Sequence, residues 1–303
     1  MSEIVINAQN LSKNFYNFDS RLPFIKRFLK RNQITIRAVQ DISFTIKRGS
    51  IVGFIGSNGA GKSTTIKMLT GTLYPSSGKL EVNGEIPFKR SINFRKKISI
   101  VVGNKLQLFQ DVSAMDYFQL IGTLYEVEPA ILQERIQELS NLLNVKDQLY
   151  QQVRTLSLGQ KMKMEFIAAS LTSPEILFLD EPTIGLDIQS KKDIRTFLKK
   201  MNEECHTTII LTSHDMDDIS SVCDELIVID KGKIILQESM DVILSKFSDF
   251  KYLKIKMTLD LVPELCSVKG VVVISQTKSE CILKIPRDFV FETLESINKL
   301  VDI

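Results

Sequence analysis

The chain has 303 residues, 44% hydrophobic and 25% charged, a composition that allows one large globular domain and a smaller one. Its 39 basic and 36 acidic residues leave a net charge of +3, which excludes a strong overall attraction to nucleic acid. Four cysteines at positions 205, 223, 266 and 281 form no CxxC pair, which favours a reducing compartment. The N-terminal residues lack the pattern of a signal peptide, and no run of about 18 apolar residues occurs. We therefore expect a cytosolic protein that does not itself span a membrane.

Two strands with a basic segment between them are expected near the N-terminus. Residues 4–11 and 39–46 have the β-branched or alternating pattern of strands. Residues 19–37 carry a single acid, Asp19, and have apolar residues at helical spacing. Their basic residues are Arg21, Lys26, Arg27, Lys30, Arg31 and Arg37. Two interpretations stay open: a solvated loop between strands, or a basic amphipathic helix near anionic lipid or a membrane partner.

A glycine-rich loop at residues 56–63, GSNGAGKS, has the spacing of a Walker A motif. The apolar run 51–55 before it suits a buried strand, and residues 64–69 after it can form a helix, which is the context that this motif requires. Glycines let backbone N–H groups approach phosphate oxygens, Lys62 would reach the β- and γ-phosphates, and the Ser63 hydroxyl would face Mg²⁺. The expected nucleotide-binding residues of this stretch are Gly56, Ser57, Asn58, Gly59, Ala60, Gly61, Lys62, Ser63 and Thr64.

Further polar residues stand at the ends of predicted strands or helices. The pattern becomes helical from about 113 to 172, and within it LSLGQ at 156–160 places a serine and a glycine at a helix start, a second but weak anion site. The strand 175–179 ends in Asp180, placed to hold Mg²⁺ opposite Ser63, and in Glu181, which can polarise a water for attack on the γ-phosphate. The strand 208–211 is followed by His214, at the strand end where ligands of parallel sheets collect.

The C-terminal residues 240–303 contain none of these motifs. Residues 252–259, 271–274 and 280–285 have strand patterns, and 290–301 has a helical stripe. The tail is predicted to be a small α/β appendage.

With these motifs in this order, residues 4–238 resemble the ATP-binding subunits of ABC transporters. LSLGQ at 156–160 resembles the ABC signature, ILFLDEP at 176–182 the Walker B motif, IGLD at 184–187 the D-loop, and TSH at 212–214 the switch-histidine motif. The resemblance implies an α/β fold, a P-loop NTPase (ABC ATPase) core with an antiparallel β subdomain and a helical subdomain. The expected domains are 1–238, with a helical subdomain at about 104–172 and the basic insert at about 17–37, and a C-terminal α/β domain at 239–303.

The resemblance also implies roles for individual residues. Two subunits would form a head-to-tail homodimer or heterodimer, in which Ser157, Gly159 and Gln160 of one subunit cap the ATP held by the Walker loop of the other. Phe15 would stack on adenine, Asp187 would link the two sites, and Glu181 and His214 would be catalytic.

Two positions depart from the family pattern. Leu158 replaces a glycine of the signature at its variable position. The family's Mg²⁺-contacting glutamine corresponds by spacing to Asn104, with Gln107 as a possible substitute. The predicted metal ligands are thus Ser63, Asp180 and Asn104.

The function expected from the resemblance is Mg·ATP hydrolysis that drives a separate integral membrane permease, with the chain peripheral on the cytoplasmic side. The sequence VRTLSLGQ at 153–160 and the basic insert most resemble those of ATP-binding subunits of multidrug or sodium exporters. Export is therefore favoured over import. The alternative is a soluble ABC ATPase that acts on ribosomes or chromosomes. One Walker loop and no sustained heptads count against it. A regulatory module without turnover is disfavoured by Glu181, and no nucleic-acid partner is expected.

Overall fold

The computed structural model describes residues 3–18, 33–248, 250–256, 271–277, 280–286, 289 and 293–295. Backbone contacts divide the chain into two compact units, Met1–Glu238 and Ser239–Ile303. Within the described residues, no helix has both the length and the hydropathy needed to cross a membrane.

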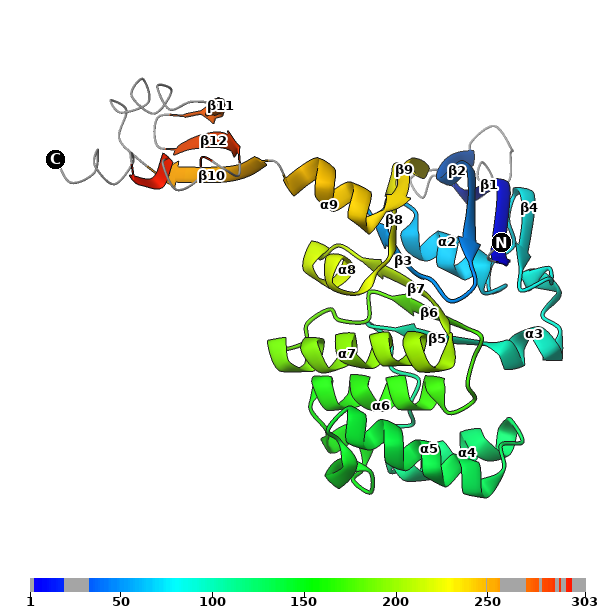
Figure 1. Ribbon diagram of the computed structural model, residues 1–303. Coiled ribbons are helices and arrows are strands. Elements are labelled where there is room, and N and C mark those ends of the chain that lie inside the picture. Colours follow the sequence, from blue (N-terminus) through cyan, green and yellow to red (C-terminus); the bar gives the residue numbers. More distant parts are fainter. Residues whose placement is uncertain are drawn as a thin grey trace. The chain divides into compact units, whose positions relative to one another are not determined.

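The first unit is built on a six-stranded sheet with the order β5-β6-β7-β3-β8-β9 (Figure 1). β5, β6, β7, β3 and β8 pair in parallel. The central strands are buried along almost their whole length, as their continuous apolar runs predict for a parallel sheet with both faces covered. The strands are β3 (Ile51–Ile55), β5 (Ile98–Val102), β6 (Ile176–Asp180), β7 (Thr208–Ser213), β8 (Glu225–Asp230) and β9 (Lys233–Ser239).

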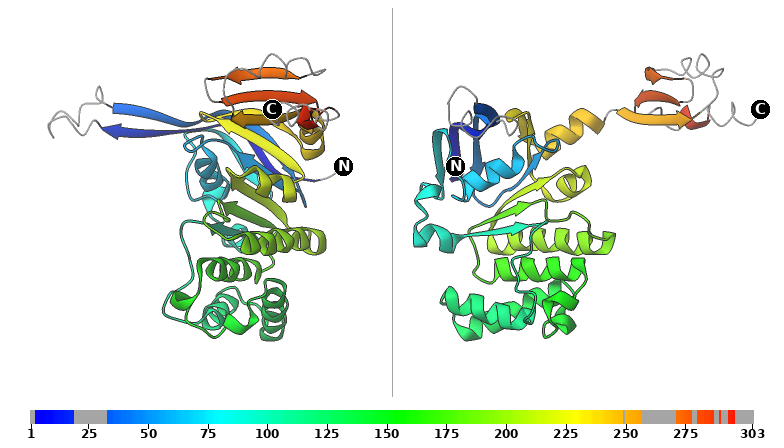
Figure 2. Two further views of the ribbon diagram at one scale, coloured as in Figure 1. Left: turned by 90° about the vertical axis from the view of Figure 1, so that its left-hand side faces the viewer. Right: turned by 180° about the vertical axis from the view of Figure 1, so that it is seen from behind.

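A second, antiparallel sheet has the order β2-β1-β4, from β1 (Ile4–Phe18), β2 (Gln33–Lys47) and β4 (Ser77–Val82). β1 and β2 are longer than the predicted strands and stay paired as far as Phe18 and Gln33, so they run out together as a hairpin (Figure 2). The end of the basic segment, 33–37, is strand and not helix. Residues 19–32 lie outside the described residues, so the amphipathic-helix hypothesis for them stays a hypothesis.

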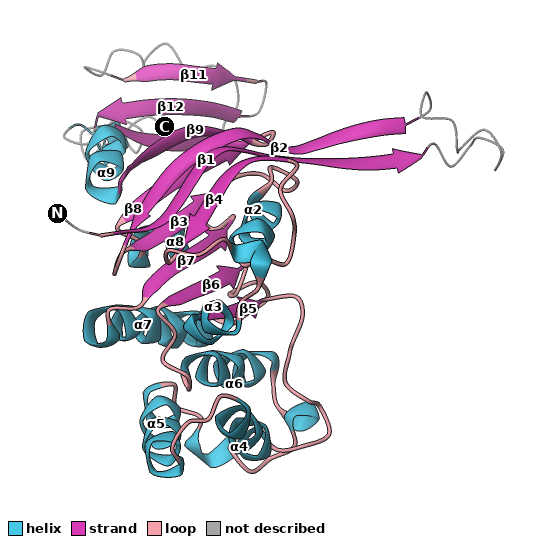
Figure 3. Cartoon of the chain, turned by 90° about the vertical axis from the view of Figure 1, so that its right-hand side faces the viewer, coloured by secondary structure: helices cyan, strands magenta, loops and turns pink. Residues whose placement is uncertain are grey.

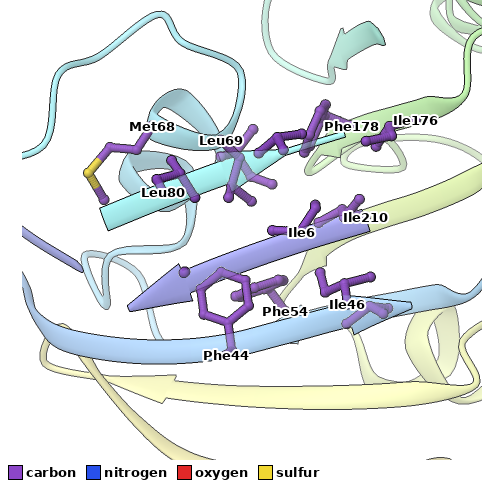
Figure 4. Close-up of a cluster of buried hydrophobic side chains, with 14 of the residues drawn as sticks. Ile6, Phe44, Ile46, Phe54, Met68, Leu69, Leu80, Ile176, Phe178 and Ile210 are labelled. Carbon is purple, nitrogen blue, oxygen red and sulfur yellow. The ribbon is translucent and has the colours of Figure 1, made fainter. Parts of the chain in front are cut away.

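The two sheets share one hydrophobic core with helix α2 (Lys62–Leu69), shown in Figure 4. Phe44 of β2 meets Phe54 of β3 edge to face, with ring centroids 5.4 Å apart. Met68 and Leu69 of α2 are fully buried in this core. The Walker helix is therefore held between the sheets, which fixes the loop at its N-terminus.

Helices form the lower part of the first unit in Figures 1 and 3. Ser113 and Asp116 form a capping box that starts α4, which explains where this helix begins. In addition to α2, this unit contains the helices α3 (Ile92–Lys97), α4 (Ala114–Leu124), α5 (Pro129–Leu142), α6 (Leu158–Ser170), α7 (Ile188–Cys205) and α8 (Met216–Val222). Short 3₁₀ turns lie at Pro87–Lys89, Lys146–Gln148 and Val153–Thr155.

The second unit contains helix α9 (Met240–Ser248) and an antiparallel sheet of order β10-β12-β11. Its strands are β10 (Phe250–Lys256), β11 (Val272–Gln276) and β12 (Glu280–Pro286), close to the strand positions that the sequence predicts. Cys281, Leu283 and Ile285 alternate along β12 and form its small core with Val271. The predicted helix at 290–301 lies largely outside the described residues.

Candidate functional site

The Walker loop leaves β3 and closes on itself before α2 begins. Ala60 N–H donates to the Ser57 carbonyl at 3.0 Å, and Gly59 and Gly61 have φ of 80° and 111°, the left-handed region that favours glycine. A Cβ on Gly61 would lie 2.6 Å from the Ala38 carbonyl oxygen, so no side chain fits there. Lys62, only 6% exposed, donates from Nζ to the Gly56 carbonyl at 2.7 Å. The loop thus presents backbone N–H groups and one nearly buried ammonium.

Asp180 lies at the end of β6, beside the start of α2. Its Oδ1 accepts from the Ser63 hydroxyl at 2.9 Å and from the Thr212 hydroxyl at 2.7 Å. Both the Asp180 side chain and Thr212 are buried. Two side-chain hydroxyls therefore hold one carboxylate oxygen of Asp180. The carboxylate and the two hydroxyls together offer only oxygen atoms as ligands, which Mg²⁺ prefers.

Glu181 faces the opposite way, toward two basic groups. His214 Nδ1 lies 2.6 Å from Glu181 Oε2, and Lys62 Nζ lies 3.5 Å from Oε1. The Glu181 backbone has φ of 52° and is held by its N–H, which donates to the Thr212 hydroxyl at 3.0 Å. The carboxylate is thereby oriented from both its side chain and its backbone.

Lys62, Ser63, Glu181 and His214 line a cavity of about 400 Å³, whereas Asp180 is not among its lining residues and contacts Ser63 instead. Asn104 lines the cavity, whereas Gln107 does not and instead donates from Nε2 to the Ile100 carbonyl at 2.9 Å. Phe15 is also not among the lining residues; it is 39% exposed, with Lys13 Nζ 5.3 Å from its ring centroid. The cavity is lined by Ala38, Asn58, Gly59, Ala60, Gly61, Lys62, Ser63, Thr64, Asn104, Glu181, Ile184 and His214.

The signature residues do not line this cavity. Ser157 caps α6 by accepting from Gln160 N–H at 3.2 Å, and the Gln160 side chain accepts from Ser157 N–H at 2.9 Å. Gly159 packs against the start of α7, where a Cβ would meet Ser190 Oγ at 2.3 Å. Asp187 caps α7, and the hydrogen bond from the Ser190 hydroxyl holds the pKa of Asp187 below its ordinary value. The signature and the D-loop are therefore one packed unit.

The roles of three residues at or near the cavity were not predicted from the sequence. Thr212 was noted only as part of the TSH motif; in the structure it joins Asp180 to the Glu181 backbone. Gly103 follows β5, and a Cβ there would lie 1.9 Å from the Glu181 carbonyl oxygen. Ala38 lines the cavity from β2, and no sequence signal marked it.

Comparison with known proteins gives a consistent result. The family described as "ABC transporter" matches residues 39–184. The chain is 32% identical over 216 residues, 71% of this chain and 87% of the relative, to the ABC transporter ATP-binding protein NatA of Bacillus subtilis. It is 34% identical over 197 residues, 65% of this chain and 63% of the relative, to the linearmycin resistance ATP-binding protein LnrL of Bacillus subtilis.

Solved structures share the fold. CbiO1 of Clostridium perfringens, described as part of the ABC transporter complex cbiONQ, is 26% identical with a TM-score of 0.66, covering 80% of this chain and 92% of that one. The ATP-binding cassette MJ0796, described as a dimer in a post-hydrolysis state bound to ADP and Pi, is 20% identical with a TM-score of 0.64, covering 78% of this chain and 98% of that one. The latter likeness concerns the fold alone.

Proposed function

Because the chain belongs to the ABC transporter ATP-binding family, we propose that it hydrolyses Mg·ATP in a head-to-tail dimer and couples hydrolysis to export by separate permease subunits. The family membership makes the chain an ATP-binding cassette and an ABC-type ATPase. The observation that carries the proposal is the pairing of Glu181 with Lys62 and His214 at the wall of the cavity behind the Walker loop.

The residues around Asp180 fit a magnesium ion that accompanies ATP. The carboxylate of Asp180 and the hydroxyl of Ser63 are in contact, and Asn104 adds an amide oxygen at the same cavity. When bound, Mg²⁺ would neutralise negative charge on the nucleotide phosphates. Asn104 is favoured over Gln107 for this role, since the Gln107 amide is hydrogen-bonded to β5.

Glu181 and His214 support hydrolysis by orienting and deprotonating a water. The carboxylate of Glu181 can accept a proton from an attacking water, and the His214 ring holds that carboxylate in one orientation. Lys62 would place its ammonium on the β- and γ-phosphates, while backbone N–H groups of residues 58–63 would hold other phosphate oxygens. These residues belong to three separate segments, which follow β3, β6 and β7 at one edge of the sheet.

The dimer proposal is supported by the signature residues. Ser157 and Leu158 are exposed and do not line the cavity of their own chain. They remain available to cap a nucleotide on a second subunit. Phe15 would complete the adenine site from β1, and Asp187 would link the two sites.

Export by separate permeases, with this chain on the cytoplasmic face of the membrane, is supported by the relatives. NatA is described as an ABC transporter ATP-binding protein, LnrL as a resistance ATP-binding protein, and cbiO1 as part of a transporter complex.

Two measurements test the proposal. Glu181→Gln removes the charge but keeps the shape, so steady-state ATP hydrolysis should fall by about 100-fold or more while ATP binding persists. Hydrolysis at the wild-type rate would refute the role of Glu181. Affinity purification of Glu181→Gln protein from detergent-solubilised membranes should recover a polytopic membrane protein. Recovery of ribosomal or DNA-bound proteins alone would favour the soluble ABC ATPase.

A further inference from the structure

Glu165 is a buried carboxylate that the proposed hydrolysis does not use. It lies on α6, about two turns after the signature serine, and is only 4% exposed. Within the described part of the chain, no lysine, arginine or histidine nitrogen lies within 4.0 Å of it. Burial raises its pKa, and two backbone hydrogen bonds oppose that rise. A buried carboxylate without a counter-ion is costly and needs compensating contacts.

The compensating contacts come from the loop between β5 and α4. Glu165 Oε1 accepts from Leu108 N–H at 2.8 Å and also from Gln107 N–H. The Gln107 side chain returns to the Ile100 carbonyl of β5. One side-chain carboxylate oxygen on α6 thus accepts hydrogen bonds from two consecutive backbone N–H groups of this loop.

The same loop starts at the catalytic edge of the sheet. Gly103 N–H donates to the Asp180 carbonyl at 2.9 Å, and Gly103 is packed so closely on the Glu181 backbone that no Cβ fits. Asn104, the next residue, lines the nucleotide cavity. The loop is therefore tied at one end to the Walker B strand and, a few residues later, to α6.

The N-terminal half of helix α6 is in turn tied to helix α7. Gly159 packs on Ser190, and Lys163 forms a nearly buried ion pair with Asp193 of α7, with Nζ and Oδ2 2.6 Å apart. In Figure 1, α6 lies between α7 and α5. A shift of this helix would carry the loop amides with it.

We propose that Glu165 is a positioning residue that fixes the loop bearing Asn104 to the signature helix. This inference rests on the proposed function, in which Asn104 faces Mg²⁺ and the signature caps a second nucleotide. Glu165 then makes the position of Asn104 in one site depend on the position of α6.

The test compares Glu165→Ala with Glu165→Gln and with a control, Ser170→Ala. Ser170 is on the same helix and buried, and its hydroxyl has no hydrogen-bond partner among the described residues, so its loss should change nothing measured here. Amide hydrogen exchange of the nucleotide-free protein is followed at residues 107 and 108. ATP hydrolysis is followed against Mg²⁺ concentration at saturating ATP.

Glu165→Ala should speed exchange at both amides by about tenfold or more, because each loses its acceptor. It should also raise the Mg²⁺ concentration for half-maximal hydrolysis by about tenfold, the cost typical of lost outer-shell contacts. Glu165→Gln keeps the acceptor without its charge and should move both quantities in the same direction by severalfold.

Each contrary result has a distinct meaning. Wild-type exchange at both amides in Glu165→Ala would overturn the tether. Faster exchange with an unchanged Mg²⁺ requirement would overturn the positioning of Asn104. If the alanine variant does not fold, the same two criteria apply to Glu165→Gln. Absence of hydrolysis in wild-type protein would instead refute the proposed function, while the exchange measurement still decides on the tether.

Discussion

Thr212→Val removes the hydroxyl that joins the Walker B carboxylate to the backbone of Glu181, with almost no change in shape. Thr212 is fully buried and donates to Asp180 at 2.7 Å. A hydrogen bond to a charged acceptor contributes about 1.5–3 kcal/mol. Glu181 N–H also donates to the Thr212 carbonyl at 3.2 Å, so this N–H still has an acceptor in the valine variant. We expect a loss of about 2 kcal/mol in the free energy of unfolding.

For a unit of this size, about 2 kcal/mol corresponds to a fall in Tm of roughly 4–8 °C. Thr207→Val is the matched control: Thr207 is equally buried but donates to a neutral acceptor, the Pro174 carbonyl, at 3.2 Å, a bond that contributes about 1 kcal/mol. Both variants are measured by calorimetry and by ATP hydrolysis. Hydrolysis should fall about tenfold in Thr212→Val only. A Tm loss no larger than that of the control, with normal hydrolysis, would refute the reasoning.

Two further predictions concern the residues around this edge. Gly103→Ala places a Cβ 1.9 Å from the Glu181 carbonyl, so we expect a stability loss of about 1–3 kcal/mol and a severalfold lower kcat; wild-type kinetics would contradict the packing. Burial raises the pKa of Glu175, but hydrogen bonds from Arg48 and Lys97 outweigh it, and the pKa is below its ordinary value. The stability that this carboxylate confers is present above its unfolded pKa and is lost as pH falls through its folded pKa. The free energy of unfolding of Glu175→Gln should therefore fall less steeply than that of the wild type as the pH is lowered. Parallel curves of unfolding free energy against pH for the two proteins would contradict this.

Those parts of the nucleotide site that are formed by short, continuous segments of sequence could be predicted. The Walker loop and its helix, the strand ending at Asp180, and the cap at Ser157 depend on local spacing, and the structure has a strand, a helix or a helix cap at each of these places. The resemblance to ABC ATP-binding subunits is confirmed by the comparisons.

Features that depend on distant partners could not be predicted. The first strand was expected to end at residue 11 and the second to begin at residue 39, whereas their pairing extends to Phe18 and Gln33, because the length of a hairpin depends on cross-strand pairs that neither strand reveals alone. The orientation of Gln107 depends on the Ile100 carbonyl, and the roles of Thr212 and Glu165 depend on groups more than 30 positions away.

The most direct test of the head-to-tail site mixes two inactive variants. Lys62→Ala removes the phosphate-binding ammonium, and Ser157→Arg blocks the signature cap; each alone should abolish hydrolysis in a homodimer. In a mixed dimer, one site combines the intact Walker loop of one chain with the intact signature of the other. Hydrolysis that appears only on mixing is the predicted result. Continued inactivity of a mixed dimer that forms, or activity of Ser157→Arg alone, would contradict a nucleotide site shared between two subunits.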